Sequence, residues 1–379
     1  MKRYMVSVSL CLLFGLAVSG CGGGGGSGGG TPETGVLTGP HLYRDLEKTL
    51  PEVLDEQADS ADEGVIREFV ATRSFLLLPP NTFTRPWPPT WRVDDTSTLD
   101  SDAYIWPAVD GGHVLHIRGR AGLRGTYPFT GEDAVEGWGA DPDADFIWPA
   151  LFGGSHPSDV GIQHDFAVAY AVAGNDGTTL QYAAYGWWAM APVPGGGASD
   201  TTRTLSAHGG MSLGIETFPR DMPGSVDSPV AATWSGPATG HAQDADGRWV
   251  LEGDTVLTAE LQGPSGRIRG MLDNMRIARI DPETLQVDAS TAGDWHEFRL
   301  METPIEGNGY KGRLSVIGTP QAGPRFFTPA GAYEGAFYGP EAAETAGQWW
   351  LIEAYADVSM GEKVVVGAFG GRRMPDSQP

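Results

Sequence analysis

The pattern of hydrophobic and polar positions divides the chain into a short helical part and a long β-rich part. In His41–Leu50, leucines recur at positions 42, 46 and 50, which is the spacing of one helical face, and Pro51 can begin a second helix. Asp59–Thr72 carries a similar apolar face and is another candidate helix. After Pro80, short runs of β-branched and aromatic residues are broken about every 8–12 residues by Gly, Pro, Asn or Asp, which predicts short strands.

The strand pattern is most regular from about Ser228 to Arg373. Glycines recur inside these runs, and a glycine within a strand commonly marks a bend where a sheet curls on itself. The predicted strands here are Val230–His241, Trp249–Leu261, Arg267–Ile280, Thr284–Ala289, Glu297–Met301, Tyr310–Ile317, Gly331–Tyr338, Gln348–Ala356 and Lys363–Gly371. About eight or nine antiparallel strands of this length suit a small closed barrel, which leaves no exposed sheet edge.

Earlier strands are predicted at His113–Arg118, Asp165–Ala173 and Thr179–Met190. The fold class is therefore mainly β. Short N-terminal helices and a β-rich domain precede a C-terminal eight-stranded antiparallel β-barrel.

The first residues predict export. Residues 1–20 have the pattern of a bacterial signal peptide, with Lys2 and Arg3 ahead of the apolar run Val6–Val18. That run is shorter than the roughly 20 apolar residues that a membrane-spanning helix needs. The small residues before Cys21 resemble the lipobox of bacterial lipoproteins, in which the cysteine becomes the acylated first residue and carries chains such as palmitate. An ordinary secretory signal with an incidental cysteine is the alternative.

Residues 21–40 are predicted to be the lipidated cysteine and a flexible tether, because residues 22–30 are all glycine apart from Ser27. By resemblance to lipoprotein sorting in Gram-negative bacteria, Gly22 in place of aspartate favours the outer membrane. We therefore expect a lipid anchor in the cell outer membrane, with the folded part facing outward.

Composition narrows the chemistry of the folded part. The only cysteines are Cys11, inside the signal, and Cys21, so no disulfide framework, zinc–cysteine site or thiol nucleophile is expected. The formal net charge is −23, and removal of Lys2 and Arg3 with the signal takes it to about −25. This charge argues against nucleic acid and anionic lipid surfaces as partners, and it favours solubility or a basic partner.

Four segments of the last third resemble the C-terminal barrel of transferrin-binding-protein-B-like lipoproteins. They are Ala232–Gly240, Gly253–Leu261, Gly335–Gly347 and Val364–Gly370, in the family's order. The Phe-Tyr-Gly-Pro run that begins at Phe337 and the closing Val-Gly-Ala-Phe-Gly strand are the most specific parts. The resemblance implies an eight-stranded barrel, residues 224–379, behind a β-rich handle domain, here residues 41–223.

The family's members include receptors for host transferrin, haemoglobin-related and complement-regulator-binding proteins, and solute-binding-like members. Transferrin receptors of this family carry two handle–barrel lobes, whereas this chain has room for one, so transferrin is not carried over as the ligand. The resemblance gives the barrel motif a structural role: Gly335, Gly339 and Pro340 shape a turn, while Phe337 and Phe369 fill the barrel.

Several patterns that resemble catalytic or metal-binding motifs have simpler explanations. Gly210-Met-Ser-Leu-Gly214 fits the nucleophile elbow of serine hydrolases, but the following Ile-Glu-Thr-Phe-Pro breaks any helix, so Ser212 is not expected to be a nucleophile. Asp141–Asp145 lacks the turn glycine and the late bidentate acid of a calcium loop. Asp244–Gly247 is better explained as a hairpin turn. No metal site is predicted.

Histidines offer the one route to a cofactor. His113 and His116 lie three apart in a predicted strand and therefore point to opposite faces. His156 and His164 flank two aspartates in a loop-rich stretch that could ligate a metal or haem iron. Solvated or packed histidines are the favoured reading, so no cofactor is expected, with haem left as an alternative.

Tryptophans are the candidates for partner contact. Trp87, Trp91, Trp106 and Trp148 lie in proline-adjacent, loop-like settings and are the candidates for an exposed interface. In the adjacent pairs Trp187/Trp188 and Trp349/Trp350, one ring of each is expected inside and one outside. The alternative is that most of these rings fill the core.

The leading hypothesis is a non-enzymatic outer-membrane lipoprotein that captures a host or environmental protein, or a protein-carried nutrient such as iron, through its handle. The partners expected are that protein or solute ligand, the membrane through the lipid anchor, an outer-membrane transporter or translocator, and no nucleic acid. A small-ligand binder for haem or another solute is the alternative. A serine hydrolase using Ser212 is a remote third.

Overall fold

The computed structural model describes the later part of the chain most fully. It describes residues 48–53, 71–78, 92–95, 103–107, 113–117, 125–129, 150–157, 163–171, 180–192, 207–244, 247–280, 286–327, 329–353 and 363–375. Side chains are described within residues 48–53, 180–190, 208–244, 247–280, 286–327, 329–353 and 363–375. All of these residues belong to one compact unit, Gly39–Pro379.

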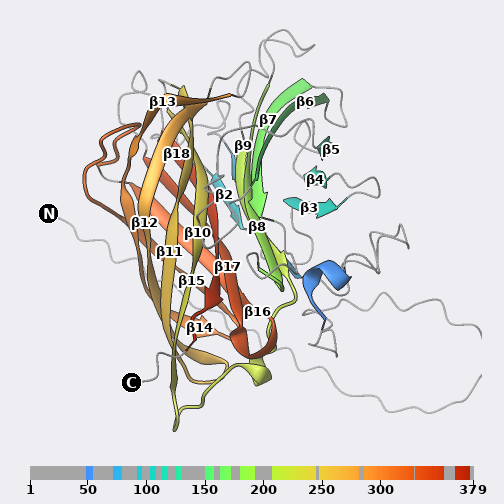
Figure 1. The fold of residues 1–379 in the computed structure, drawn as a ribbon, viewed down its shortest axis with the longest axis vertical. Helices are drawn as coiled ribbons and strands as arrows, with labels where there is room; N and C mark the ends of the chain where they lie inside the picture. Colours follow the sequence, from blue (N-terminus) through green and yellow to red (C-terminus); the bar gives the residue numbers. More distant parts are fainter. Residues whose placement is uncertain are drawn as a thin grey trace, which may run out of the picture. The chain divides into compact units, whose positions relative to one another are not determined.

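Two antiparallel sheets come first along the chain (Figure 1). One is six-stranded, with the order β2–β1–β9–β8–β7–β6, and the other is three-stranded, with the order β3–β4–β5. The bounds are β1 Ala71–Leu78, β2 Arg92–Asp95, β3 Ala103–Pro107, β4 His113–Ile117, β5 Gly125–Phe129, β6 Ala150–Pro157, β7 Gln163–Ala171, β8 Ala183–Pro192 and β9 Ala207–Gly214.

The remaining strands close into the predicted eight-stranded antiparallel barrel (Figure 1). Around the barrel the order is β11–β10–β18–β17–β16–β15–β14–β12, and β12 pairs back with β11, while β13 pairs on the side of β12. The bounds are β10 Val230–Asp244, β11 Gly247–Leu261, β12 Ser265–Ile280, β13 Val287–Asp294, β14 Glu297–Glu306, β15 Gly309–Ile317, β16 Ala330–Tyr338, β17 Glu344–Glu353 and β18 Lys363–Arg373. The predicted fold class is confirmed.

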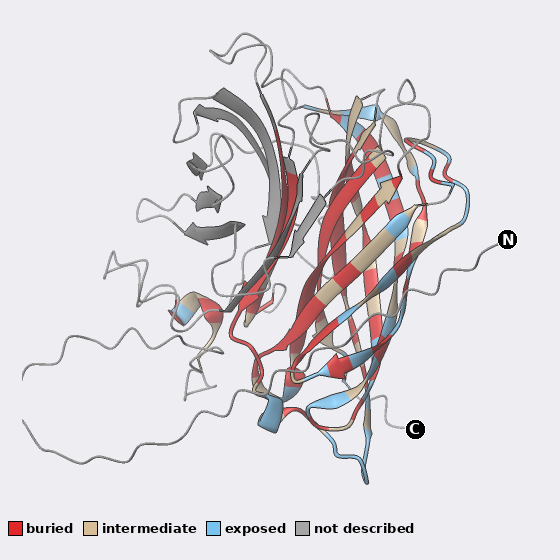
Figure 2. Cartoon of the chain, turned by 180° about the vertical axis from the view of Figure 1, so that it is seen from behind, coloured by how far each residue is buried: buried red, intermediate tan, exposed pale blue. Residues whose placement is uncertain are grey.

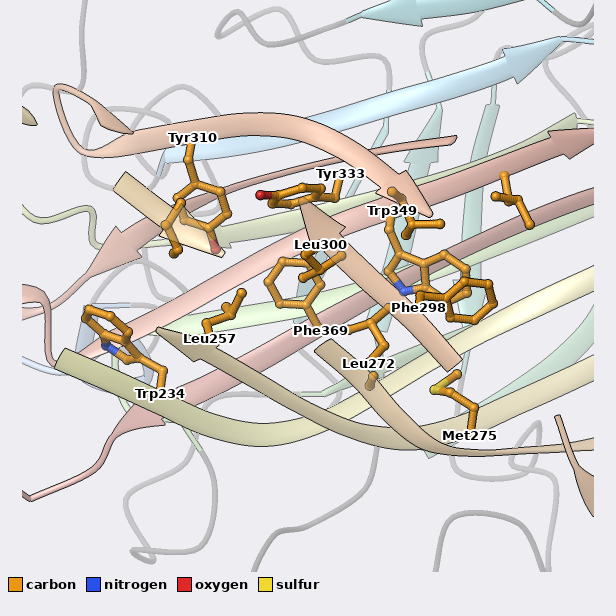
Figure 3. Close-up of a cluster of buried hydrophobic side chains, with 14 of the residues drawn as sticks. Trp234, Leu257, Leu272, Met275, Phe298, Leu300, Tyr310, Tyr333, Trp349 and Phe369 are labelled. Atoms are coloured by element: carbon orange, nitrogen blue, oxygen red, sulfur yellow. The ribbon is translucent and has the colours of Figure 1, made fainter. Parts of the chain in front are cut away.

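Side chains of the barrel's own strands fill its interior (Figure 3). Trp234, Phe298 and Trp349 are fully buried there, and Phe337 and Phe369 lie in the same cluster, as the sequence predicted. Glycines make room for these rings. A Cβ on Gly367 would lie 2.3 Å from Cε2 of Trp349, so only glycine permits that ring and the strand to approach so closely.

Two short connections follow local sequence rules. Gly247 N donates to Asp244 Oδ1 at 3.1 Å where β10 turns into β11, which confirms the predicted hairpin. Residues 50–53 are helical, and Glu52 Oε2 accepts from Thr49 N at 2.6 Å in the geometry of a capping box. No helix among the described residues is long and apolar enough to cross a membrane.

One helix boundary predicted from the sequence is wrong. Asp59–Thr72 was expected to be helical, but Ala71 and Thr72 already belong to β1, which pairs with β9 from Ala71 to Leu77. The β-branched and aromatic residues of this run suit a strand as well as a helix, and pairing with β9 decides in favour of the strand. The rest of the predicted helix, and most of His41–Leu50, lie outside the described residues.

The six-stranded sheet packs on the barrel through β8 and β9, which contact β17 and β18; β8 also contacts β10. Figure 2 shows buried residues on β8, on β9 and on the barrel strands that they cover. A small apolar cluster joins the two layers: Leu180, Ala183 and Tyr185 from the sheet side, and Ala336, Tyr338, Ala346 and Ala368 from the barrel.

Candidate functional site

The junction between sheet and barrel holds the buried polar groups of β8 and β9. Trp187 Nε1 donates to Thr239 Oγ1 at 3.0 Å, and Thr239 in turn donates to the carbonyl of Leu251 at 3.1 Å. Tyr185 packs so closely on Gly370 that a Cβ there would lie 2.3 Å from its ring. These contacts require that Tyr185 and Trp187 face the barrel, as alternate residues of one strand do.

Glu344 ties the start of β8 to the barrel. Its carboxylate accepts hydrogen bonds from the backbone amides of Gln181, Tyr182 and Ala183 at 2.6, 2.8 and 3.1 Å. The turn that precedes it needs unusual backbone, with φ of 73° at Gly339 and 53° at Glu341. Burial raises the pKa of Glu344, and the three amides and Arg372 oppose that rise. Glu344 is therefore a structural clamp between the two layers.

Two histidines meet in the same junction. The rings of His208 on β9 and His241 on β10 stack with centroids 5.4 Å apart, and Trp187 lies 5.3 Å from His241. Burial lowers the pKa of His208 to about 3, with Arg248 acting in the same direction. Burial, His208 and Arg248 hold the pKa of His241 well below its usual value. Both rings are therefore neutral at physiological pH.

The histidine pair has too few ligands for a metal. Among the residues whose side chains are described, no three His, Cys, Asp or Glu side chains come together as a metal site would require. The residues that the sequence singled out as haem ligands lie elsewhere: His113 is in β4, and His156 pairs with His164 between β6 and β7. The loop-rich reading of the last two is wrong, because both lie in paired strands.

Ser212 occupies the middle of β9, paired with Tyr185 and Arg73, and is fully buried. Its Oγ accepts a hydrogen bond from Tyr338 at 3.2 Å. A nucleophile elbow needs an exposed serine between a strand and a helix, whereas β9 continues to Gly214. The expectation that Ser212 is not a nucleophile agrees with this position.

Of the four tryptophans predicted to contact a partner, Trp106 alone lies within the described residues. Trp106 lies in strand β3, opposite Val114, so its expected loop setting is wrong. Trp87, Trp91 and Trp148 lie outside the described residues, as do Cys21 and the Asp141–Asp145 loop. Their roles stay predictions.

The paired tryptophans alternate between faces as expected, but the expected exposure of one ring is seen in one pair only. Trp349 is buried and Trp350 is partly exposed, but Trp187 and Trp188 are both fully buried. The reason is that β8 is covered on both faces. Trp187 faces the barrel, and the opposite face holds Trp188 with the buried Met190, Met211 and Leu213.

The outer surface of the barrel carries features that sequence reasoning missed. Phe327, in the loop between β15 and β16, is 74% exposed, although its backbone amide donates to Glu353 Oε1 at 2.7 Å, and Lys363 Nζ lies 5.8 Å from the centre of its ring. Three exposed arginines, Arg269, Arg299 and Arg313, lie on β12, β14 and β15. In the sequence, the alternation of apolar and polar residues marks these arginines as outward-facing. It does not show which strands become neighbours.

The chain was compared with known proteins. No family model matches it, and no curated protein matches it. Solved structures similar to it include a mutant of the vaccine antigen transferrin binding protein B from Haemophilus parasuis Hp5, with 15% identity and a TM-score of 0.38 over 82% of this chain and 45% of that chain. Another is isotype 1 transferrin binding protein B from serogroup B Neisseria meningitidis, with 12% identity and a TM-score of 0.34 over 81% of this chain and 44% of that chain. The chain thus spans less than half the length of these structures.

Proposed function

We propose that this protein is a non-enzymatic binding protein, anchored by lipid in the outer membrane, that holds a protein or a protein-carried nutrient such as iron at the cell surface. The single observation that carries the proposal is the filled barrel. Its interior is occupied by its own large side chains, including Trp234, Phe298 and Trp349, so a ligand of the barrel meets its outer surface.

The outer surface offers a suitable anchor for a protein partner. Phe327, in the loop between β15 and β16, exposes 74% of its surface while its own amide donates to Glu353. Aromatic anchors of this kind commonly dominate protein–protein interfaces, because they bury a large area at a small cost in side-chain entropy. A hydrolase role for Ser212 has no support, since that hydroxyl is buried under Tyr338.

The anchoring part of the proposal rests on the residues around Cys21 and is tested on intact cells. The full chain, expressed in a Gram-negative host with labelled palmitate, is expected to incorporate label, and Cys21→Ser is expected to abolish it. Protease added to intact cells should remove the folded part if it faces outward. Label on the Cys21→Ser variant, or complete resistance to the protease, would contradict the anchor or its orientation respectively.

The binding part is tested with the chain lacking residues 1–20 and carrying Cys21→Ser. Immobilised chain is incubated with host-fluid and growth-medium proteins, each retained protein is identified by mass spectrometry, and its binding is then repeated with purified material. Saturable binding that Phe327→Ser weakens, while the exposed control Val226→Ser does not, supports the proposal. Retention of no protein, with a small molecule detected by native mass spectrometry, would favour the small-ligand reading.

A further inference from the structure

The outer wall of the barrel carries a row of arginines without acidic partners. Arg269, Arg299 and Arg313 are exposed, and no carboxylate among the described residues forms an ion pair with any of them. Other exposed cations of the same wall are paired: Arg267 with Glu302 at 2.9 Å and Lys311 with Glu334 at 3.3 Å. In a chain of net charge −23, these three arginines are positive charges that no described carboxylate pairs with.

Strand register brings the three arginines together. Leu300 of β14 pairs with Gly270 of β12 on one side and with Leu314 of β15 on the other. Beyond Leu300 the register of both ladders shifts, so Met301 and Glu302 together lie opposite Arg269, between the Leu300–Gly270 and Thr303–Ile268 pairs, and Arg313 borders the same irregularity on β15. Arg299 pairs with Ser315 of β15 and with Met271 of β12. It therefore lies two residues before Met301, on the same outward face of β14.

The row has the dimensions of a single extended segment. Neighbouring strands lie about 4.8 Å apart, so β12 and β15, on either side of β14, present their arginines about 10 Å apart. Alternate side chains of an extended peptide are about 7 Å apart. A strand-like segment crossing the row can thus bring two or three carboxylates to the guanidinium groups, whose planar forks bind carboxylate in pairs of hydrogen bonds.

Apolar and acidic residues surround the row, and both bear on which partner can bind there. Met301 is 43% exposed at the centre of the row, and a flexible thioether can adapt to the side chains of a partner. Two acidic positions lie at one end of the row. Asp273, two residues after Met271 in β12, pairs with Asp254 of β11, and Glu297 of β14 directly precedes Phe298, which pairs with Leu272. On the other side, Glu260 pairs in register with Arg267, whose guanidinium binds Glu302.

These flanking carboxylates define the shape of the partner. A flat anionic membrane would meet the acidic positions together with the arginines, and the two effects would oppose each other. A narrow acidic segment can lie between the flanks, and the Glu302 carboxylate that lies among the arginines is engaged by Arg267. Acidic residues elsewhere on the chain repel such a segment, so they direct it to the row.

We infer that Arg269, Arg299 and Arg313, grouped around Met301, are a docking site for a carboxylate-rich extended segment of a partner protein. The inference rests on the proposed binding function and deepens it, because it names the chemistry of the partner and places the contact on β12, β14 and β15.

The first test titrates a synthetic probe into the chain lacking residues 1–20 and carrying Cys21→Ser. The probe is a labelled peptide of about ten residues in which Glu alternates with Ser, so that its carboxylates share one face when extended. Its neutral counterpart alternates Gln with Ser. Binding of the acidic peptide is expected to weaken as NaCl is raised, and the neutral peptide is expected not to bind.

A charge-matched pair of variants locates the contact. Arg269→Glu with Arg313→Glu reverses two arginines of the row, and Arg220→Glu with Arg325→Glu makes the same charge change at exposed positions outside it. The row variant is expected to weaken binding of the acidic peptide by at least about tenfold, and the control variant by less than about twofold. Near-ultraviolet circular dichroism verifies that both variants keep the native fold.

The inference is overturned if the neutral peptide binds equally well, or if both variants lose the same affinity. It is also overturned if binding is seen only with vesicles containing anionic lipid, or only between two copies of the chain by sedimentation. The row variant is then applied to any protein captured by the wild-type chain. Unchanged capture would leave the binding function standing and refute the site, whereas no capture by the wild type refutes the function and leaves the peptide titration to decide the row.

Discussion

The buried histidine pair predicts that acid destabilises the fold at one identifiable place. His208 stacks on His241 between β9 and β10, and burial and Arg248 lower the pKa of His208 to about 3. In the unfolded chain the same ring has a pKa of about 6.5. Between these two pKa values, the unfolded state therefore binds a proton at His208 that the folded state does not bind. The stability is intact above the unfolded pKa and falls as pH drops from there toward about 3.

The magnitude follows from the separation of the two pKa values. Between them, each unit of pH removes about 1.4 kcal/mol from the free energy of unfolding, so His208 accounts for a loss of about 2 kcal/mol at about pH 5. His241, whose pKa is lowered by burial, His208 and Arg248, acts in the same direction. A domain has about 5–15 kcal/mol of stability in total, so a loss of this size is readily measured.

The assay is urea unfolding of wild type and His208→Phe, each at about pH 7.5 and about pH 5. Phenylalanine keeps a planar ring beside His241 and removes the titrating group, and any packing cost it brings is common to both pH values. Expected is a pH-dependent loss about 2 kcal/mol smaller in the variant than in wild type. Equal losses in the two proteins would refute the reading that the folded state keeps His208 neutral.

Three further substitutions test the junction and the barrel by the same unfolding measurement. Glu344→Ala leaves the amides of Gln181, Tyr182 and Ala183 without their acceptor and should cost about 3–5 kcal/mol, whereas the exposed neighbour Glu341→Ala should cost far less; equal costs would contradict the clamp. Trp187→Phe keeps the ring packing but removes the hydrogen bond to Thr239, so we expect a loss of about 1–2 kcal/mol, and no loss would mean that this bond contributes nothing. Gly367→Ala places a methyl 2.3 Å from the Trp349 ring and 2.4 Å from the Thr239 carbonyl; it should destabilise the barrel by at least about 2 kcal/mol and alter tryptophan fluorescence, and a native-like variant would show that the close approach is unnecessary.

The barrel was largely predictable because its strands alternate inward apolar and outward polar residues over their length. The errors fall where that alternation is interrupted. Thr284–Ala289 was predicted as a strand, but β13 runs from Val287 to Asp294 through polar residues that flank the barrel. β14 continues past Met301 to Glu306 because an irregularity in register accommodates the residues between Leu300 and Ile305.

The junction was not predictable, because it depends on contacts between residues far apart in the sequence. No local pattern places Trp187 against Thr239, or the carboxylate of Glu344 against residues 181–183. The same holds for the arginine row, since Arg269, Arg299 and Arg313 become neighbours only through the register of three strands. The sequence pattern predicts which face of a strand each residue occupies. Tertiary packing determines which residues that face contacts.

The closure of the barrel also bears on how such a chain is made. β10 forms its second ladder with β18, so the barrel cannot close until β18 has emerged. β18 and its neighbour β17 also carry the surface on which β8 and β9 pack. Contacts of such long sequence separation form slowly, because the loop between the strands must lose its freedom first. For a chain that is exported as proposed, this order of events keeps the barrel open, and therefore threadable, until β18 has crossed the membrane.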